Sequence, residues 1–284
     1  MSVEVLRCLP EQPTAKPPLL FVHGAWHAAW CWTEHFLPYF ADRGYPAYAL
    51  SLRAHGKSPG KLKWASLSDY VADVTEAVDR IPTSPILIGH SMGGGVVQKY
   101  LETRDAPGAV LLASMPPYGI LPRMLKFSRS HPLKFLRANL TMSFKCLVSA
   151  PELAREYFFS PSLPPEDLAR FLGLLQDESY RAFLDMIALD LPNPERVQTP
   201  MLVLGAENDT IFSPADILET ALRYEADMRI LSGLAHDMML DTRWRDAADA
   251  IAAWLDSRWG RSSLSSQPPA KVLQASFGAL RKAG

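Results

Sequence analysis

The stretch Ser84-Pro85-Ile86-Leu87-Ile88-Gly89-His90-Ser91-Met92-Gly93-Gly94-Gly95-Val96-Val97 sets the architecture of this chain. Its first half is a short apolar run typical of a buried strand, and the segment 92–103 has the pattern of a helix. Between them stands a G-x-S-x-G sequence, which in this strand-turn-helix context predicts a nucleophile elbow. We expect strained backbone at Ser91. We expect glycine at 89 and 93 because a side chain there would collide with the neighbouring strand or helix.

A serine on such a turn projects its hydroxyl at the positive end of a helix, but it needs a base to take its proton. Seven histidines are available. His236 is the candidate base, because it alone follows the last expected strand, and the chain order serine, acid, histidine fits this arrangement. The side chain of His90 is expected to diverge from that of Ser91. His23 and His55 are expected to hold loops together by hydrogen bonds.

The orienting acid is expected at the end of another strand. Gly205-Ala206-Glu207-Asn208-Asp209-Thr210 supplies it, and Asp209 is chosen as the partner of the second imidazole nitrogen of His236. Glu207 is the nearest competitor and is expected to be solvated. The loop 114–117, the other common place for this acid, contains no carboxylate.

An oxyanion formed at Ser91 would need two preorganised backbone donors. The amide of Met92, directly after the serine, is the first. The second is expected in the loop that follows Val22, where His23-Gly24 permits close approach of the backbone; Ala25 is the choice and Trp26 the alternative.

Strands and helices alternate through most of the chain. Strands are expected at 3–8, 19–22, 46–51, before Ser91, and at 109–113, 200–205 and 227–231, and helices at 30–43, 66–80, 92–103, 213–223 and 244–260. This alternation predicts an α/β fold with a mostly parallel central sheet covered by helices on both faces. Ligands of such sheets bind at the carboxyl ends of the strands, where all the candidate residues lie.

The alternation of strands and helices stops between residues 115 and 198, where prolines recur and no run of β-branched residues indicates a strand. We expect residues 1–114 and 199–260 to form the core, 115–198 a helical cap insertion, and 261–284 a flexible tail with marginal helix. The cap is rich in aromatic residues and methionine, so it could roof an apolar pocket over the strand ends. The pocket is expected to involve Trp26, His27, Met115 and Phe158.

Composition excludes several classes of partner. The formal net charge of −1 without a basic half argues against nucleic acid as a partner. No secretory leader and no apolar run of membrane-spanning length is visible, so no integral membrane segment is expected. The three scattered cysteines predict neither disulfides nor a zinc site, which favours a reducing, cytoplasmic location. No metal and no cofactor is expected, and the sequence leaves the oligomeric state open.

Together these residues resemble the α/β-hydrolase fold superfamily over residues 1–114 and 199–258. The family's oxyanion loop, elbow, acid and base are matched by His23-Gly24, Gly89-His90-Ser91-Met92-Gly93, Asp209 and His236. Arg53-Ala54-His55-Gly56-Lys57-Ser58 looks like the R-G-H-G-x-S loop of its esterase and C–C hydrolase members.

The opening 23–32 is also similar to the H-G-A-x-H-G-x-W-x-W segment of plant-type methyl esterases and hydroxynitrile lyases. The lyases carry threonine after H-G and lysine after the catalytic histidine. Ala25 and Asp237 stand at those positions, which disfavours cyanohydrin cleavage. A serine nucleophile likewise disfavours haloalkane dehalogenase, which uses aspartate.

The predicted function is a serine hydrolase that cleaves carboxylic or thio esters of apolar small molecules through an acyl-enzyme intermediate. Two alternatives keep the same residues, namely a C–C bond hydrolase and a cofactor-independent oxygenase that uses His236 as a base. A third is a non-catalytic, ligand-binding protein on the same fold. The fold by itself fixes no substrate.

Overall fold

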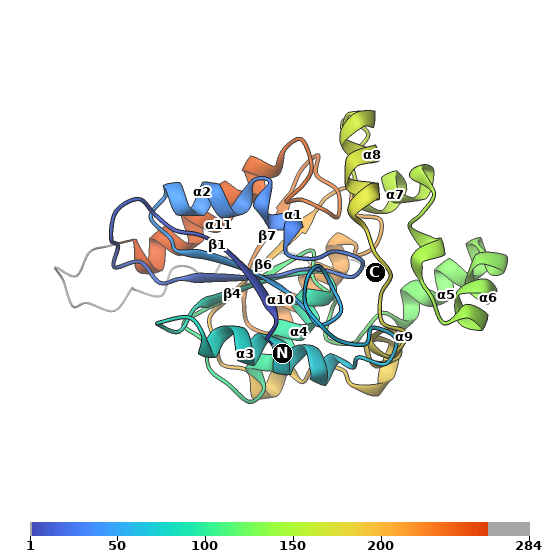
Figure 1. Ribbon diagram of the computed structural model, residues 1–284, viewed down its shortest axis with the longest axis horizontal. Helices are drawn as coiled ribbons and strands as arrows, with labels where there is room; N and C mark the ends of the chain where they lie inside the picture. The colour runs from blue at the N-terminus through green and yellow to red at the C-terminus, as the bar shows by residue number, and fades with distance from the viewer. Residues whose placement is uncertain (1, 261–284) are drawn as a thin grey trace, which may run out of the picture.

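A computed structural model describes residues 2–260 and places seven strands in one sheet with the order β1-β3-β2-β4-β5-β6-β7 (Figure 1). The strands are β1 (Glu4–Cys8), β2 (Leu19–Val22), β3 (Ala47–Ser51), β4 (Ile86–His90), β5 (Ala109–Leu112), β6 (Met201–Ala206) and β7 (Asp227–Leu231). β1 pairs antiparallel with β3, and all other pairs are parallel. The predicted α/β class with a mostly parallel sheet is confirmed.

Helices cover both faces of the sheet (Figure 1). One face carries α1 (Trp30–Thr33), α2 (Phe36–Asp42) and α11 (Trp244–Trp259), and the other carries α3 (Leu67–Asp79), α4 (Met92–Leu101) and α10 (Pro214–Arg223). Every residue of the central strands β2, β4, β5 and β6 is therefore buried, which explains why these strands read as continuous apolar runs. The edge strand β7 is largely exposed.

The expected helix over residues 30–43 is two helices, and that prediction is wrong. His35 interrupts it with a non-helical backbone at φ −135°, and α2 restarts at Phe36. The restart places Pro38 in the first turn of α2, where a proline costs no intrahelical hydrogen bond because the N–H it lacks would have had no partner. Gly44 ends α2 with φ +83°, as its position after the helix predicted.

Two helix starts follow from their local sequence. The side chain of Ser66 accepts a hydrogen bond from the amide of Asp69, and the Asp69 carboxylate accepts one from the amide of Ser66. This reciprocal capping box starts α3, as expected. Ser213 and Asp216 form the same arrangement at the start of α10, with Pro214 in the first helical position.

The segment between β5 and β6 is helical, and its described residues contain no strand. It contains α5 (Leu121–Ser130), α6 (Pro132–Thr141), α7 (Pro151–Phe158), α8 (Pro165–Leu174) and α9 (Tyr180–Leu184), with the short helices η1 (Lys145–Leu147), η2 (Asp185–Leu189) and η3 (Pro194–Arg196). The helices α5 to α9 lie at one end of the sheet (Figure 1). Prolines open α6, α7 and α8, where their missing N–H is not needed.

The division into core, cap and tail stays a prediction. The expected tail, 261–284, lies outside the described residues. Among residues 2–260, no helix combines the length and the apolar character that a bilayer crossing requires.

Candidate active site

Ser91 lies on the sharp turn between β4 and α4, with φ 51° and ψ −120°. This left-handed conformation is strained for a residue with a side chain, as expected for an elbow. Two glycines make the turn possible. A Cβ atom on Gly93 would lie 2.4 Å from the carbonyl oxygen of Val22, and one on Gly89 would lie 2.5 Å from that of Gly93. The elbow therefore fits only because glycine stands at both positions.

Asp209 and His236 meet at the ends of neighbouring strands. Asp209 follows β6, His236 follows β7, and His236 Nδ1 lies 2.8 Å from Asp209 Oδ2. The other carboxylate oxygen, Oδ1, accepts hydrogen bonds from the amides of Ile211 and Phe212 at 2.8 and 2.9 Å. Asp209 is thus held by its own loop, with one oxygen left to orient the imidazole.

The surroundings of His236 change its acidity. Burial lowers the pKa of the imidazole, but the carboxylate of Asp209 outweighs burial, so the net pKa is raised above its usual 6.5. Because Nδ1 faces Asp209, the hydrogen on this nitrogen is donated to the carboxylate and Nε2 is the nitrogen that can accept a proton.

The competing acid and the other histidines have separate partners. Glu207 is exposed and accepts hydrogen bonds from the hydroxyl of Ser232 and the amide of Gly233, not from His236. His23 binds the carbonyl of its neighbour and accepts a hydrogen bond from the amide of Leu52 at 3.1 Å. His23 thus holds its loop, as the sequence predicted, and Glu207 is exposed to solvent, as expected.

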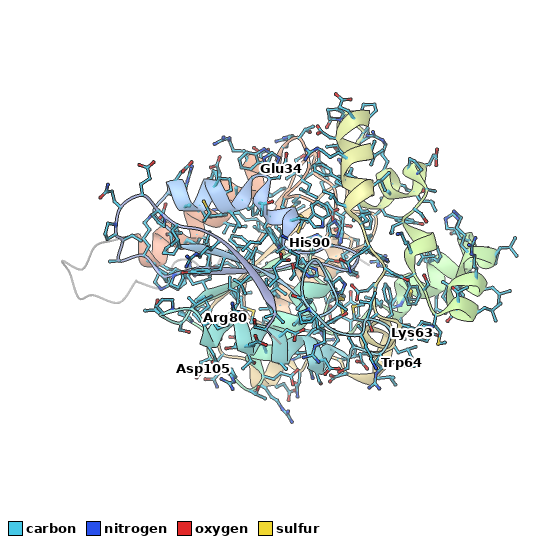
Figure 2. All side chains as sticks on the ribbon, viewed as in Figure 1. Glu34, Lys63, Trp64, Arg80, His90 and Asp105 are labelled. Carbon is cyan, nitrogen blue, oxygen red and sulfur yellow. The ribbon has the colours of Figure 1, made fainter. Side chains whose placement is uncertain are left out.

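His90 lies deep in the interior near the middle of the molecule (Figure 2). Its Nε2 is 3.1 Å from the carbonyl oxygen of His236, and its ring centroid is 4.8 Å from that of His236. Burial, with the neighbouring imidazole of His236, lowers the pKa of His90 to about 3, so this ring is neutral. It supports the base loop instead of transferring protons.

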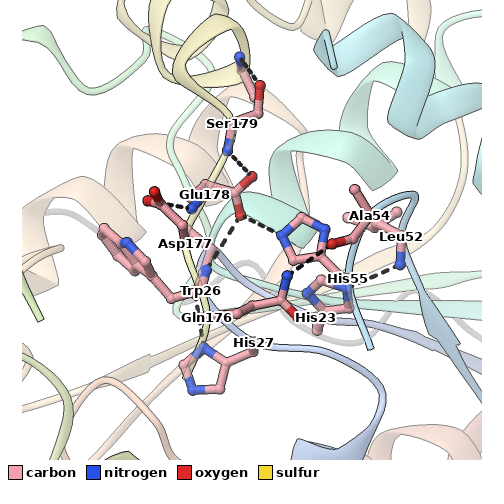
Figure 3. A network of polar contacts seen from close by, with 12 residues as sticks. His23, Trp26, His27, Leu52, Ala54, His55, Gln176, Asp177, Glu178 and Ser179 are labelled. Atoms are coloured by element: carbon pink, nitrogen blue, oxygen red, sulfur yellow. Dashed lines mark hydrogen bonds and ion pairs between the residues drawn. The ribbon is translucent and has the colours of Figure 1, made fainter. Parts of the chain in front are cut away.

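The loop after β2 approaches the elbow closely, since a Cβ atom on Gly24 would lie 2.9 Å from the Cβ of Ser91. The amide of Trp26, the alternative second donor, points to Glu178 Oε2 at 3.3 Å, and Trp26 has φ 65° (Figure 3). Within residues 2–260, the amides of Ala25 and Met92 make no hydrogen bond. This geometry favours Ala25 over Trp26 as the partner of Met92.

Glu178 is a residue that the sequence analysis missed. It is fully buried and binds His55 Nε2 at 3.1 Å and the amide of Ser179 at 2.6 Å (Figure 3). It also accepts a hydrogen bond from the hydroxyl of Tyr70 at 2.7 Å. It thereby ties the segment between β5 and β6 to the loop that carries Trp26. Nothing local in the sequence marks it, since its side-chain partners His55 and Tyr70 lie more than a hundred residues away.

A cavity of about 260 Å³ opens onto Ser91. Ala25, Met92, Trp26, Met115 and Phe158, all expected at the site, line it. The segment between β5 and β6 adds mostly apolar side chains, among them Met124, Phe127, Leu147, Val148, Phe183 and Met186. The ring of His236 packs against Phe158 and Phe212 of the lining, with centroid distances of 6.2 and 5.7 Å.

His27 does not line this cavity, which corrects the expected pocket. Its side chain is buried, with Nδ1 2.8 Å from the carbonyl oxygen of Ala25 and Nε2 3.0 Å from Asp237 Oδ2. The imidazole is turned into the protein by these two contacts. The local sequence placed it on the right loop but did not show which way it points.

One cluster in the described part of the chain has potential metal-ligand atoms that all lie within 4.8 Å of one another. It consists of His90, His236 and Asp237. Their existing contacts account for this proximity. His236 Nδ1 is bonded to Asp209, and the carboxylate of Asp237 lies between His27 and His90 at 3.0 and 3.6 Å.

Comparison with known proteins agrees with this geometry. The model of the alpha/beta hydrolase family matches residues 19–254. The non-heme chloroperoxidase of Streptomyces lividans is 37% identical over 248 residues, which is 78% of this chain and 86% of that protein. The pFDCC methylesterase of Arabidopsis thaliana is 29% identical over 205 residues, covering 68% and 77%. The solved esterase of Exiguobacterium antarcticum superposes with a TM-score of 0.69 at 15% identity, covering 89% and 95%.

Proposed function

This chain belongs to the alpha/beta hydrolase family and is a hydrolase of the serine type, and we propose that Ser91, His236 and Asp209 are the catalytic triad with which it cleaves carboxylic or thio esters of apolar small molecules. The observation that carries the proposal is the 2.8 Å contact between Asp209 and His236 at the strand ends beside the Ser91 elbow. This contact joins two of the three residues, and the 3.1 Å contact between Nε2 of His90, which precedes Ser91, and the carbonyl oxygen of His236 supports assigning Ser91 as the third.

In the acylation step, Ser91 Oγ attacks the carbonyl carbon of the ester while His236 Nε2 takes the hydroxyl proton. The tetrahedral intermediate collapses, the bond to the alcohol or thiol breaks, and His236 returns the proton to that leaving group. Asp209 holds the imidazole in the tautomer whose Nε2 is free, and it stabilises the imidazolium while the proton is in transit. The acyl group is then bonded to Ser91.

In the deacylation step, water gives a proton to His236 Nε2 and attacks the acyl carbon. The bond from this carbon to Ser91 Oγ then breaks, His236 returns the proton to Oγ, and the carboxylic acid leaves. Both steps place negative charge on the former carbonyl oxygen. We assign the stabilisation of this oxyanion to the amides of Ala25 and Met92, each worth roughly 10²–10³ in rate. Because these groups act through the backbone, substitution of the two side chains need not abolish activity.

The lining of the cavity supports the substrate class. Most of the side chains that line the cavity are methionines, aromatic residues and branched aliphatic residues. Its charged members are Lys126, Glu156 and Arg123, and Arg123 is ion-paired with Asp216. The apolar majority favours an apolar acyl or aryl part of the substrate. The methylesterase relative is by its name an ester hydrolase, whereas the chloroperoxidase is named for a different reaction. Activity on esters is therefore the property to measure.

The test combines covalent labelling with turnover. A fluorophosphonate probe is expected to label the protein, and the Ser91→Ala variant is expected to lose both labelling and esterase activity while keeping its thermal stability. Ser130 also lines the cavity but lies on α5, so Ser130→Ala is the matched control and should still be labelled. Absence of labelling in the folded wild type would remove the acyl-enzyme proposal and favour a non-catalytic role.

The substrate class is tested with p-nitrophenyl esters of increasing acyl length and with charged analogues of similar size. Longer apolar acyl groups are expected to raise kcat/KM until they outgrow the cavity. Equal or faster turnover of the charged esters would contradict an apolar preference. We also propose a cytoplasmic location with no nucleic-acid partner, which the formal charge of −1 and the free thiols of Cys8 and Cys31 support.

A further inference from the structure

The helices α5 and α6 form a cap hairpin, Leu121–Thr141, with unusually exposed apolar side chains. Leu133, Leu136 and Leu140 are 80%, 54% and 75% exposed, and their spacing puts them on one face of α6. Leu121 and Leu125 on α5 are 45% and 47% exposed. The hairpin thus holds five of the twelve large apolar side chains that are exposed among the described residues. A cluster of this kind marks an interaction surface.

The same hairpin is strongly basic. Between residues 106 and 151 the sequence contains six lysines and arginines and no aspartate or glutamate, although the whole chain has a net charge of −1. Within residues 2–260, Lys126, Arg129 and Arg137 make no ion pair, and all three side chains are exposed. Their charges are therefore not neutralised by the protein itself.

The cap hairpin also borders the catalytic cavity. Met124 and Phe127 of α5 line that cavity, while Leu121 and Leu125 of the same helix are exposed to solvent. Figure 1 shows α5 and α6 side by side at the edge of the molecule, and Figure 2 shows their side chains projecting from it. One helix thus presents one set of side chains to the site and another to the outside.

We infer that the cap hairpin docks on the surface of an anionic lipid bilayer. Exposed leucines enter the boundary between headgroups and acyl chains, and the interleaved cations lie against the anionic headgroups, which is the pattern of interfacial amphipathic helices. Charge complementarity selects this occupant. A second copy of the chain would bring two unneutralised basic faces together, and a purely polyanionic partner would leave the leucines in water. Docking does not depend on turnover by Ser91.

Vesicle flotation with the full chain tests the inference directly. The protein is expected to float with vesicles of phosphatidylcholine mixed with phosphatidylglycerol and to stay in solution with vesicles of phosphatidylcholine alone. Added salt should weaken the association, because charges at an exposed surface are screened within a Debye length of about 10 Å at 0.1 M. Equal binding to both kinds of vesicle, or to neither, would overturn the inference.

Two sets of variants locate the surface. Arg129→Gln with Arg137→Gln should weaken partitioning to the anionic vesicles by roughly tenfold or more, since each cation near such a surface contributes about fivefold. The matched control changes two exposed cations elsewhere, Arg7 and Arg229, to glutamine and should leave partitioning within about twofold. A control that loses as much as the hairpin variant would show that only net charge matters.

Leu133→Ser with Leu136→Ser and Leu140→Ser should likewise reduce partitioning at least tenfold. Leu218→Ser with Leu222→Ser on α10 is its control, because those side chains are 47% and 67% exposed. Hydrolysis of a water-soluble ester should be unchanged in all four variants, which separates docking from catalysis. A different result would assign the surface to a second copy of the chain. In that case the wild type would not bind vesicles, and light scattering would show a dimer for the wild type but a monomer for the hairpin leucine variant.

Discussion

The carboxylate of Asp237 lies 3.0 Å from Nε2 of His27, with both side chains buried. His27 also binds the carbonyl oxygen of Ala25 through Nδ1, and Asp237 directly follows His236. This pair thus joins the loop that presents the Ala25 amide to the loop that carries the base. Burial raises the pKa of the Asp237 carboxyl, but the nearby imidazoles, that of His27 first, outweigh burial and hold it below its usual value.

We expect Asp237→Asn to slow catalysis by at least tenfold in kcat with little change in KM, because loosening the pair moves the base and the oxyanion donor but not the pocket. Asp237 also helps to raise the pKa of His236, so the acid limb of kcat/KM should move to lower pH in the variant. Steady-state kinetics across pH measure both effects. A loss of activity with an unmoved acid limb would assign Asp237 to folding alone.

The double variant with His27→Gln checks that the two residues act together. If they do, adding His27→Gln to Asp237→Asn should cost much less than His27→Gln alone. Additive losses would contradict a shared positioning role. Circular dichroism and thermal melting of each variant serve as the control for fold.

The pH dependence of the wild type follows from the environment of His236. Because its pKa is raised above 6.5, the base is protonated in mild acid, and kcat/KM should rise with pH through a midpoint above 6.5. Asp209→Asn should lower kcat by about 10⁴-fold and move the midpoint of the remaining activity downward, since the carboxylate that raises the pKa is gone. A midpoint below 6 in the wild type would contradict the assigned pair.

Features with short-range causes could be read from the sequence. The elbow at Ser91, the capping box at Ser66 and the proline start of α10 each depend on residues within a few positions. The strand ends that carry Asp209 and His236 followed from the rule that parallel strands finish at one edge of the sheet. These predictions needed no knowledge of distant contacts.

Features that depend on long-range contacts could not be predicted from the amino-acid sequence. Glu178 meets His55 across 123 positions, and Asp237 meets His27 from the opposite end of the chain. A buried carboxylate has no periodic pattern, and the direction of the His27 ring is decided by Asp237 rather than by its neighbours. The expectation that His27 lines the pocket was wrong for this reason.

The tight packing at the elbow predicts a large cost for one added methyl group. Gly93→Ala should destabilise the protein by roughly 3 kcal/mol, because its Cβ would lie 2.4 Å from the carbonyl oxygens of Val22 and His23, and backbone cannot give way cheaply. Gly173→Ala in α8 is the matched control. Nothing lies within 4 Å of that Cβ, so the variant should be more stable by about 0.5–1 kcal/mol. Urea unfolding measures both, and equal effects would contradict the steric argument.

The buried pair of Glu178 and His55 predicts a pH window of stability. Burial raises the pKa of the Glu178 carboxyl, but the imidazole of His55 outweighs burial, so the net pKa of Glu178 is below 4.5. Burial lowers the pKa of His55, but the carboxylate of Glu178 outweighs burial, so the net pKa of His55 is above 6.5. The contribution of Glu178 is present above pH 4.5 and is lost as pH falls through its lowered pKa. That of His55 is present below pH 6.5 and is lost as pH rises through its raised pKa.

Glu178→Gln should therefore lower the free energy of unfolding most between pH 4.5 and 6.5, by roughly 3 kcal/mol, with a smaller difference from wild type on either side. Glu166→Gln, at an exposed position in the first turn of α8, should stay within about 0.5 kcal/mol throughout. Urea unfolding at a series of pH values gives both curves. A difference that does not shrink above pH 6.5 would mean that His55 is not the charged partner of Glu178, because only a charged imidazole loses its interaction with the carboxylate as the pH rises.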